Sequence, residues 1–207
     1  MNYCAIIGDI VGSKNIKNRK KVQEQFQSVI QMANDQYDAY IASYFTITLG
    51  DEFQGLLYTP SICFDVIDFI KEKMKPVDLV FGIGVGSMET SFSKTVAIGS
   101  DGPAYWYARK MVEKAKLKKP SICFFSDSPE DELINALILF TEACTQSQTK
   151  RQQEVVGLYK ELGSQYKVAE KLKISQSAVS VTLQKALFKE IEHSQKVIKR
   201  FLEEKWA

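Results

Sequence analysis

The chain has 207 residues, of which 45% are hydrophobic and 25% charged, and its formal net charge at pH 7 is +2. At roughly 100–200 residues per domain, this length predicts one large domain or a medium domain with a small one. The ordinary apolar fraction excludes a wholly disordered chain. Residues 1–148 carry 15 Lys and Arg against 18 Asp and Glu, whereas residues 149–207 carry 12 against 7. The near-neutral total is therefore a cancellation between a net charge of −3 in the first segment and +5 in the second. Such an asymmetry is typical of a basic binding module attached to a domain of a different kind.

The start of the chain and its cysteines indicate a cytoplasmic protein. Met1 is followed directly by a short apolar run that reaches Gly8 and Asp9, too early for a signal sequence. No stretch approaches the ~18–20 apolar residues of a membrane span. The single histidine, His193, is far from the cysteines, and there is no CxxC pair, so a zinc site is disfavoured. We expect the four cysteines to be reduced core residues: Cys4, Cys63, Cys123 and Cys144.

The first three quarters of the chain alternate β-branched or apolar runs with helical periodicities. Strands are predicted at residues 3–10, 40–48, 53–58, 77–86 and 120–125. Helices are predicted at residues 18–37, 61–74, 103–116 and 128–144. The tight turn at residues 49–52 joins two of the strands as a hairpin. This order predicts a mixed α+β domain built around one mostly antiparallel sheet.

Three glycines fall on one face of the strand predicted at residues 77–86. Gly82, Gly84 and Gly86 alternate with apolar residues, so that one side of this strand has no side chains. Such a face usually means that another backbone or a ligand approaches closely.

Two aspartates lie where strands end. Asp9 closes the first strand, and Asp51 lies in the hairpin turn. If the first strand lies beside the hairpin, both carboxylates emerge at the same end of the sheet. Mg²⁺ is commonly held by one or two carboxylates together with substrate phosphates, and the backbone N–H groups at Gly12 and Ser13 can serve those phosphates. The alternative is that Asp9 and Asp51 are only a helix cap and a turn residue.

The segments that hold these aspartates resemble a known fold. The hairpin TLGDEF at residues 48–53, the strand end with Asp9 and the run FGIGVG at residues 81–86 resemble class III nucleotidyl cyclases and diguanylate cyclases. The resemblance implies a ferredoxin-like βαββαβ domain in which the two aspartates bind two Mg²⁺ ions and position a nucleoside triphosphate. The whole chain, with GDIVGSK near its start, LGDEFQGLL in the middle and a helical tail, is similar to the bacterial SatD family.

The sequence departs from the cyclases at the positions that carry their chemistry. Ile47 stands where purine cyclases usually have a base-selecting lysine, and Leu49 replaces the first glycine of the diguanylate cyclase turn. Trp106 takes the place of the cyclase asparagine, and Arg109 falls one residue before the cyclase arginine. Because cyclisation needs a positioned positive charge at the transition state, these departures predict little or no turnover.

Other residues of these segments keep binding roles. Arg109 and Lys110 are candidates for holding a phosphate, as are Gly12 and Ser13. Tyr105 and Trp106 are expected to be core residues or, alternatively, an aromatic platform for a base. Glu52 is expected to face solvent or to play a minor supporting part.

The basic C-terminal part has the pattern of a helix-turn-helix. Residues 145–153 are polar and predict a linker, followed by a supporting helix at residues 151–162 that Gly163 ends. Apolar spacing predicts two further helices joined by a tight turn at residues 173–175, with Ser175 capping the second. Recognition helices read base edges from their N-terminal residues. The predicted DNA-binding residues, supported on phosphates by Lys167 and Lys171, are Lys173, Ser175, Gln176, Ser177, Ser180, Gln184 and Lys185.

The alternative for this part is a generic three-helix bundle whose lysines form a solvated face. The last amphipathic helix, residues 188–206, either wraps the small module or forms the seam of a homodimer, with His193 on its polar side. We therefore predict a nucleotide-cyclase-like α+β domain at residues 1–146 and a small all-α helix-turn-helix domain at residues 150–207. The predicted function is a cytoplasmic, DNA-binding transcription regulator whose first domain senses a nucleotide or a divalent metal such as Mg²⁺, or only scaffolds. The alternative is a Mg²⁺-dependent enzyme acting on a nucleoside triphosphate at Asp9 and Asp51.

Overall fold

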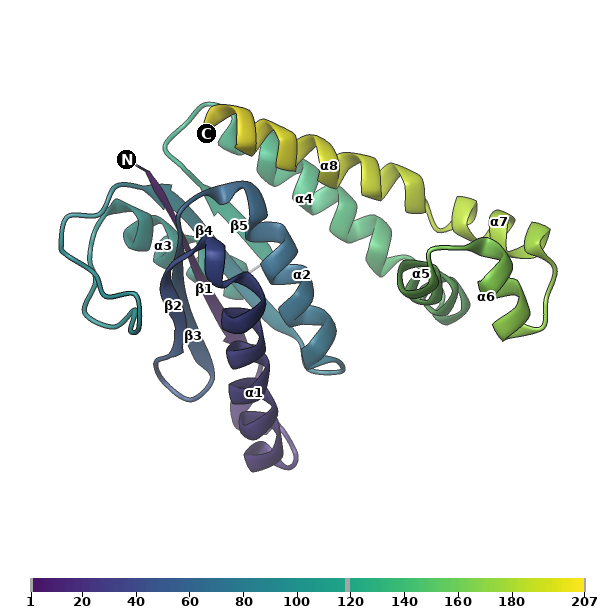
Figure 1. Cartoon of the computed structure of the whole chain (residues 1–207), viewed down its shortest axis with the longest axis horizontal. Helices are drawn as coiled ribbons and strands as arrows, with labels where there is room; N and C mark the ends of the chain where they lie inside the picture. The colour runs from purple at the N-terminus through teal and green to yellow at the C-terminus, as the bar shows by residue number, and fades with distance from the viewer. Residues whose placement is uncertain (1, 118–119, 207) are drawn as a thin grey trace. The chain divides into compact units, whose positions relative to one another are not determined.

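The computed structural model describes residues 2–117 and 120–206, and Figure 1 shows their mixed α+β arrangement. The strands are β1 (Tyr3–Ile10), β2 (Ile41–Ile47), β3 (Glu52–Leu57), β4 (Leu79–Gly86) and β5 (Ile122–Phe125). The longer helices of the first 146 residues are α1 (Arg19–Tyr37), α2 (Cys63–Met74), α3 (Pro103–Leu117) and α4 (Asp131–Gln146). They are followed by α5 (Lys150–Leu162), α6 (Gln165–Leu172), α7 (Gln176–Lys185) and α8 (Phe188–Lys205). The predicted strands and helices are all present, and their ends differ from the prediction by a few residues.

The five strands form one sheet in the order β2-β3-β1-β4-β5. The pairs β1–β3, β1–β4 and β2–β3 are antiparallel, and only β4–β5 is parallel. The prediction of a mostly antiparallel sheet is therefore confirmed. The short connection between β2 and β3 is a hairpin, as the turn residues indicated.

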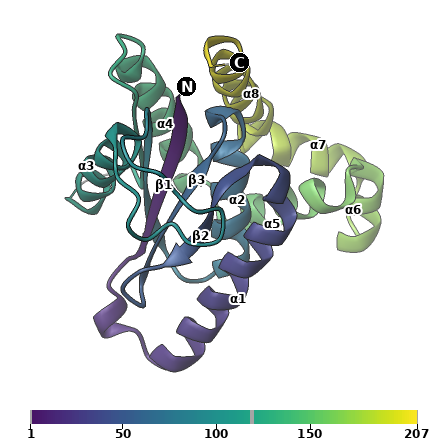
Figure 2. The ribbon, with the colours of Figure 1, turned by 60° about the vertical axis from the view of Figure 1, so that its left-hand side comes forward.

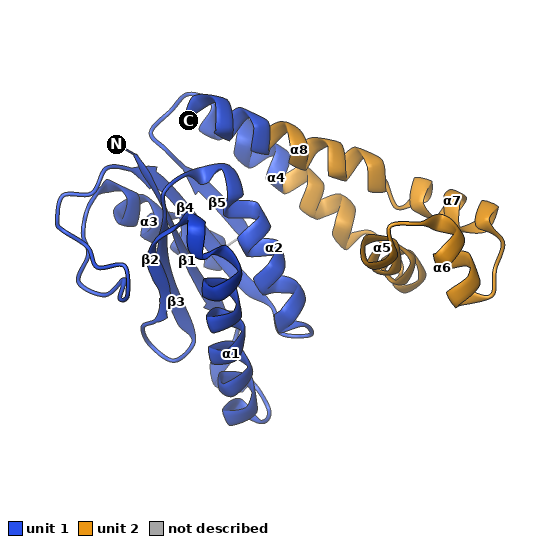
Figure 3. Ribbon diagram, in the orientation of Figure 1, with its two compact units in different colours: residues 1–138, 199–207 blue, residues 139–198 orange. Residues whose placement is uncertain are grey.

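The chain divides into two compact units, which Figure 3 shows in two colours. The first unit comprises residues 1–138 and 199–207, and the second comprises residues 139–198. Residues 199–207 thus return to the first unit, where Lys199 forms a 2.6 Å ion pair with Asp65 and the Trp206 ring lies 6.4 Å from that of Phe124.

In the first unit, helices cover both faces of the sheet, with α1 and α3 on opposite sides (Figure 2). An aromatic cluster fills the face under α1: the Phe53 ring lies 5.9 Å from Phe26 and 5.6 Å from Phe45, edge to face. Phe81 completes it at 6.3 Å from Phe53. Edge-to-face packing is a preferred aromatic arrangement and adds to the burial of apolar area.

The opposite face carries α3, which lies directly on the backbone of β4. A Cβ added at Gly82 would lie 2.1 Å from the Ala108 carbonyl oxygen, and one at Gly84 would lie 2.2 Å from the Ala104 carbonyl oxygen. The prediction that another backbone approaches this glycine face is confirmed. Farther along α3, Arg109 lies 2.5 Å from Glu52 of β3 and Lys116 lies 3.1 Å from Asp9 of β1, where the candidate site lies.

The nine polar residues predicted as a linker are mostly helical. Helix α4 runs to Gln146 and α5 starts at Lys150, so only residues 147–149 lie outside a helix. Thr149 caps α5 through a reciprocal pair of hydrogen bonds with Gln152. The T-x-x-Q spacing is a helix-start signal that outweighs the polar composition.

All four cysteines are free, as predicted, and three of them are buried, whereas Cys144 is half-buried, so the prediction of a core position is wrong for Cys144. Among the described residues, no helix has both the length and the apolar composition needed to cross a membrane.

Candidate functional site

Asp9 and Asp51 lie at the same end of the sheet. Asp9 is the second-last residue of β1 and lies directly opposite Glu52 in the register with β3. The Asp51 carbonyl accepts a 2.9 Å hydrogen bond from the Ile10 backbone N–H, which continues the β1–β3 ladder. The Asp51 carboxylate accepts a 2.5 Å hydrogen bond from Ser13 Oγ, in the turn after β1. The antiparallel pairing of β1 with the hairpin thus brings the two predicted aspartates to neighbouring positions.

Glu52 is buried, so of the two alternatives predicted for it, the one in which it faces solvent is wrong. Its exposed fraction is 4%, and its carboxylate receives two hydrogen bonds from the Arg109 guanidinium, at 2.5 Å and 2.9 Å. The Thr48 hydroxyl donates a third, at 3.0 Å. Burial by itself raises the pKa of Glu52, but the hydrogen bonds and charge of Arg109 outweigh it, so that this pKa lies below its usual value. Glu52 is therefore an ionised, buried carboxylate held by α3.

Lys116 compensates the second carboxylate of this edge. Its Nζ lies 3.1 Å from Asp9 Oδ2, 3.9 Å from Glu52 Oε2 and 3.1 Å from Glu113 Oε1. Desolvation raises the pKa of Asp9, and the charges of Asp51 and Glu52 add to that rise, whereas Lys116 lowers it by a smaller amount. Burial lowers the pKa of Lys116, but its hydrogen bonds to Asp9 and Glu113 raise it overall. Two cations from α3, Arg109 and Lys116, thus lie against the carboxylates of the sheet edge.

These partners decide how the predicted Mg²⁺ fits. Mg²⁺ requires near-octahedral oxygen ligands at about 2.0–2.1 Å, so it would have to displace Lys116 from Asp9 and Ser13 from Asp51. Across residues 2–117 and 120–206, no three or more His, Cys, Asp or Glu side chains group in a way that could hold a metal ion. In this arrangement Asp9 is paired with the Lys116 ammonium and Asp51 with the Ser13 hydroxyl.

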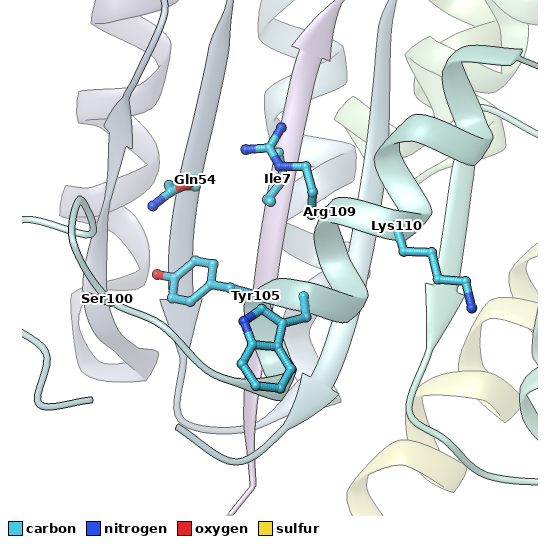
Figure 4. A pocket seen from close by; sticks show the side chains of 7 residues that line it. Ile7, Gln54, Ser100, Tyr105, Arg109 and Lys110 are labelled. Atoms are coloured by element: carbon cyan, nitrogen blue, oxygen red, sulfur yellow. The ribbon is translucent and has the colours of Figure 1, made fainter. Parts of the chain in front are cut away.

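The four residues predicted to bind phosphate have different surroundings. Gly12 has a φ of 63° and precedes a short helical turn that begins at Ser13, whose hydroxyl is already engaged. Arg109 is held by Glu52, whereas Lys110 Nζ lies 5.1 Å from the centroid of the Phe125 ring. Figure 4 shows Arg109 and Lys110 leaving α3 in different directions. The structure therefore does not direct these two cations at one common phosphate position.

A pocket of about 480 Å³ opens on the face of the sheet that α3 covers (Figure 4). Its volume is in the range of small-molecule sites. Tyr105 is buried in the apolar cluster beneath α3, as the core alternative predicted, whereas Trp106 is 47% exposed. The lining residues are Ile7, Gln54, Ser100, Tyr105, Trp106, Arg109 and Lys110.

Sequence reasoning missed Ile7, Gln54 and Ser100. The signal available for Gln54 was strand alternation, because residues 52, 54 and 56 of β3 share one face, which makes a glutamine between Glu52 and Leu56 an inward polar group. Ser100 lies in the long segment between β4 and α3, for which the sequence offered no signal.

In the second unit, α5, α6 and α7 pack on one another. Val155 from α5, Val168 from α6 and Val179 from α7 are each fully buried in a shared apolar cluster, which Ala169 and Leu183 complete. The chain leaves α6 through Lys173, which has a φ of 52°. Ser175 then caps α7 by accepting a 3.1 Å hydrogen bond from the Ala178 N–H, as predicted.

The side of α7 opposite this core is exposed. Ser177, Ser180 and Gln184 are exposed at helical spacing, and Val181 between them is 49% exposed. Gln176 is half-buried and donates a 2.5 Å hydrogen bond to Gln165 of α6, which ties the start of α7 to that helix. Sequence reasoning missed Val181, although the i, i+3, i+4, i+7 spacing of this stripe contains it.

Several predicted cations of this unit point to solvent. Lys173 and Lys185 are exposed, and within the described part of the chain neither forms an ion pair with a carboxylate. Lys171 lies 3.6 Å from Glu161, so its charge is partly compensated. His193 is exposed on α8, in agreement with its predicted polar side.

Solved structures similar to this chain include nucleotide cyclase domains. A bacterial light-regulated adenylyl cyclase aligns at 11% identity over 59% of this chain and 74% of its own, with a TM-score of 0.45. The guanylate cyclase domain of RhGC from Catenaria anguillulae, in complex with GTP, aligns at 13% identity over 59% and 77%, with a TM-score of 0.42. A regulator of polyketide synthase expression from Bifidobacterium adolescentis covers 97% of this chain and 82% of its own at 14% identity, with a TM-score of 0.29. At these identities the likenesses carry no conclusion about activity.

No curated protein matches the sequence significantly. The model of one family, described as the SatD family, matches residues 3–201. This match spans both units and nearly the whole sequence, and the chain therefore belongs to the SatD family.

Proposed function

We propose that this chain is a cytoplasmic, DNA-binding regulatory protein. Helices α5, α6 and α7 of the second unit act as a helix-turn-helix domain in which α7 is the recognition helix. Residues 1–146 form a ferredoxin-like, nucleotide-cyclase-like domain that senses a small ligand. The strand order β2-β3-β1-β4 with antiparallel pairing supports the second assignment.

The observation that carries the proposal is the outward face of α7. A recognition helix needs its N-terminal half exposed, with polar groups for base edges and cations nearby for phosphates. Ser177, Ser180 and Gln184 supply hydroxyl and amide groups, and glutamine can pair with adenine through two hydrogen bonds. Val181 adds an apolar contact of the kind that thymine methyl groups accept. The exposed cations Lys173 and Lys185 flank this face at the turn and at the end of α7.

The test measures binding of the full chain to labelled duplex DNA by fluorescence anisotropy at several salt concentrations, after selection from a random pool. Each phosphate contact contributes about 0.9 to the slope of log affinity against log salt. Lys173→Gln and Lys185→Gln should each lower that slope by about 1. Lys196→Gln, which removes the same charge from α8, should leave it unchanged.

Gln184→Ala should weaken binding to the selected sequence more than to a scrambled one, because it removes a base contact rather than a phosphate contact. If the protein binds as a dimer, the selected site will contain two half-sites about one helical turn apart. Absence of salt-dependent binding, or an equal effect of all three lysine substitutions, would refute the helix-turn-helix assignment.

The rival function is a Mg²⁺-dependent reaction of a nucleoside triphosphate at Asp9 and Asp51. It is less well supported, because the Lys116 ammonium already compensates Asp9 and the Ser13 hydroxyl already binds Asp51. Incubation with ATP or GTP plus Mg²⁺ or Mn²⁺, followed by chromatography, decides between them. A product made by the wild-type chain and lost in Asp51→Asn would replace our proposal with the enzymatic one.

A further inference from the structure

The Tyr105 hydroxyl lacks a hydrogen-bond partner among the described residues although it is buried. Tyr105 is 6% exposed, and burial raises the pKa of its phenol well above the usual value, so the hydroxyl stays protonated at every relevant pH. Leaving a buried hydroxyl unpaired costs about 1–3 kcal/mol. The residue also lines the 480 Å³ pocket, and Figure 4 shows its ring extending from α3 toward the strand that carries Gln54. The unpaired donor therefore belongs to a residue that lines the pocket, and because its oxygen is covered, a ligand acceptor reaches it by displacing the atoms that cover it.

Trp106 provides a flat apolar wall beside that donor. Its indole N–H donates a 2.5 Å hydrogen bond to Asp101 Oδ1, which fixes the orientation of the ring. Its exposed fraction of 47% leaves much of the ring uncovered. A fixed, uncovered indole face next to a pocket favours contact with a planar aromatic molecule.

The floor of the pocket is held in place by the sheet. Ile7 on β1 is 1% exposed, and Gln54 on β3 donates a 2.9 Å hydrogen bond from its amide nitrogen to the Ala97 carbonyl. Because that bond uses one of the two amide N–H groups of Gln54, the other N–H and the amide oxygen are left for the pocket. The site thus combines one hydroxyl donor, one amide and apolar walls, as small-molecule sites usually do.

Of the two cations that line the pocket, Lys110 lies over the Phe125 ring and Arg109 is bound to a carboxylate, which weakens both as partners for a polyanion. Asp9, Glu52 and Glu113 bring three carboxylates to the edge next to Arg109, against the two cations of α3 that they bind. Arg109 is committed to Glu52 by two hydrogen bonds. A triphosphate here would need to break that pair and then face the carboxylates it releases.

We propose that this pocket binds a planar heteroaromatic ring with a keto oxygen, of nucleobase to nucleoside size and without a polyphosphate chain. The keto oxygen accepts the Tyr105 hydrogen bond, and the ring packs against Trp106. This inference names the ligand class for the sensing role proposed above, and it rests on that proposal only for its biological purpose. The binding itself is measurable in the absence of DNA, so its failure and the failure of DNA binding are separate results.

The experiment uses a Trp206→Phe background, in which Trp106 is the only tryptophan and reports binding by a change in fluorescence. Phenylalanine at 206 keeps an aromatic ring beside Phe124 and Phe201. The probes are inosine, the matched nucleoside nebularine that lacks the keto oxygen, inosine triphosphate, and lumazine as a keto-pteridine. We expect saturable binding of inosine or of lumazine, and the one that binds more tightly shows whether the ligand is a nucleoside or a pteridine. We also expect at least tenfold weaker binding of nebularine than of inosine, and weaker binding of inosine triphosphate than of inosine.

The matched variant is Tyr105→Phe, which removes only the hydroxyl. It should weaken binding of the keto probe at least tenfold, while the melting temperature of the free protein stays the same or rises because an unpaired polar group is removed. No saturable binding of inosine or lumazine at millimolar concentration overturns the proposal. Equal binding by Tyr105→Phe, or tighter binding of inosine triphosphate than of inosine, overturns it as well.

Discussion

The buried pair of Glu52 and Arg109 makes an asymmetric prediction about stability. The Glu52 side chain is 5% exposed, whereas that of Arg109 is 43% exposed. Arg109→Met leaves a carboxylate in the interior with only Thr48 and the more distant Lys116 as partners. Glu52→Gln leaves a guanidinium that water can still reach. The arginine substitution should therefore cost more than the glutamate substitution, although both remove the same ion pair.

Breaking a buried pair by removing one partner costs about 3–5 kcal/mol. Because Arg109 is partly exposed, we expect the low end for Arg109→Met, about 3 kcal/mol, and about 1–2 kcal/mol for Glu52→Gln. At about 2–4 °C per kcal/mol for a chain of this size, Arg109→Met should lower the melting temperature by about 6–12 °C. Urea unfolding followed by circular dichroism measures both variants and the double variant. If Arg109→Met is no more destabilising than Glu52→Gln, the carboxylate is not desolvated and the reasoning fails.

The same pair gives a pH dependence with a defined sign. The pKa of Glu52 is lowered in the folded state, so its contribution to stability is complete above the unfolded value of about 4.3 and is lost as the pH falls through the folded value. The wild-type free energy of unfolding should therefore fall more steeply below pH 4.3 than that of Glu52→Gln. If the free energies of unfolding of the two proteins fall equally steeply below pH 4.3, the lowered pKa of Glu52 is contradicted.

Three further substitutions test other parts of the structure. Gly84→Ala should lower the free energy of unfolding by more than about 3 kcal/mol, because the added Cβ would collide with the backbone of α3. Gly157→Ala in α5, where no atom lies within 4 Å of the added Cβ, should raise it by about 0.5–1 kcal/mol. Urea unfolding measures both. Lys116→Met removes the ammonium from Asp9, so that Mg²⁺ should raise the melting temperature of this variant more than that of the wild type; an equal rise in both would show that Lys116 does not block a cation. Lys173→Gly should raise the melting temperature, since it relieves a positive φ, and lower the salt slope of DNA binding; a lower melting temperature would show that the lysine side chain stabilises the turn.

The architecture of the sheet could be predicted because its signals are local. The predicted bounds of the first strand equal those of β1, and the alternation of Gly82, Gly84 and Gly86 predicts the close approach of another backbone, which in the structure is that of α3. The Ser175 cap and the apolar spacing around it likewise predicted α6 and α7. In each case, the residues that determine the element are close to one another in the sequence.

The content of the candidate site could not be predicted, because it depends on pairs that are far apart in the sequence. Glu52 and Arg109 are separated by 57 residues, and only the packing of α3 on the sheet shows that they meet. From the sequence alone, a glutamate beside a hairpin turn is expected at the surface, and an arginine on a later helix is expected to be free to bind phosphate. A sequence also cannot show that the Tyr105 hydroxyl is unpaired, since this depends on which polar groups the fold places near it.

The seating of α3 on β4 has a mechanical consequence for the pocket. With helix backbone against strand backbone, α3 has no side-chain layer on which to slide, so Tyr105 and Trp106 sit on a fixed wall. Residues 87–102, of which Ser100 lines the pocket, are held by individual hydrogen bonds: from Tyr44 to Lys94 at 2.8 Å and from Ser43 to Ser93 at 2.6 Å on β2, from Gln54 to Ala97 on β3, and from Trp106 to Asp101 on α3. A bound molecule should therefore slow amide exchange in residues 87–102 and leave α3 unchanged, which makes that segment the part of the first unit able to relay occupancy.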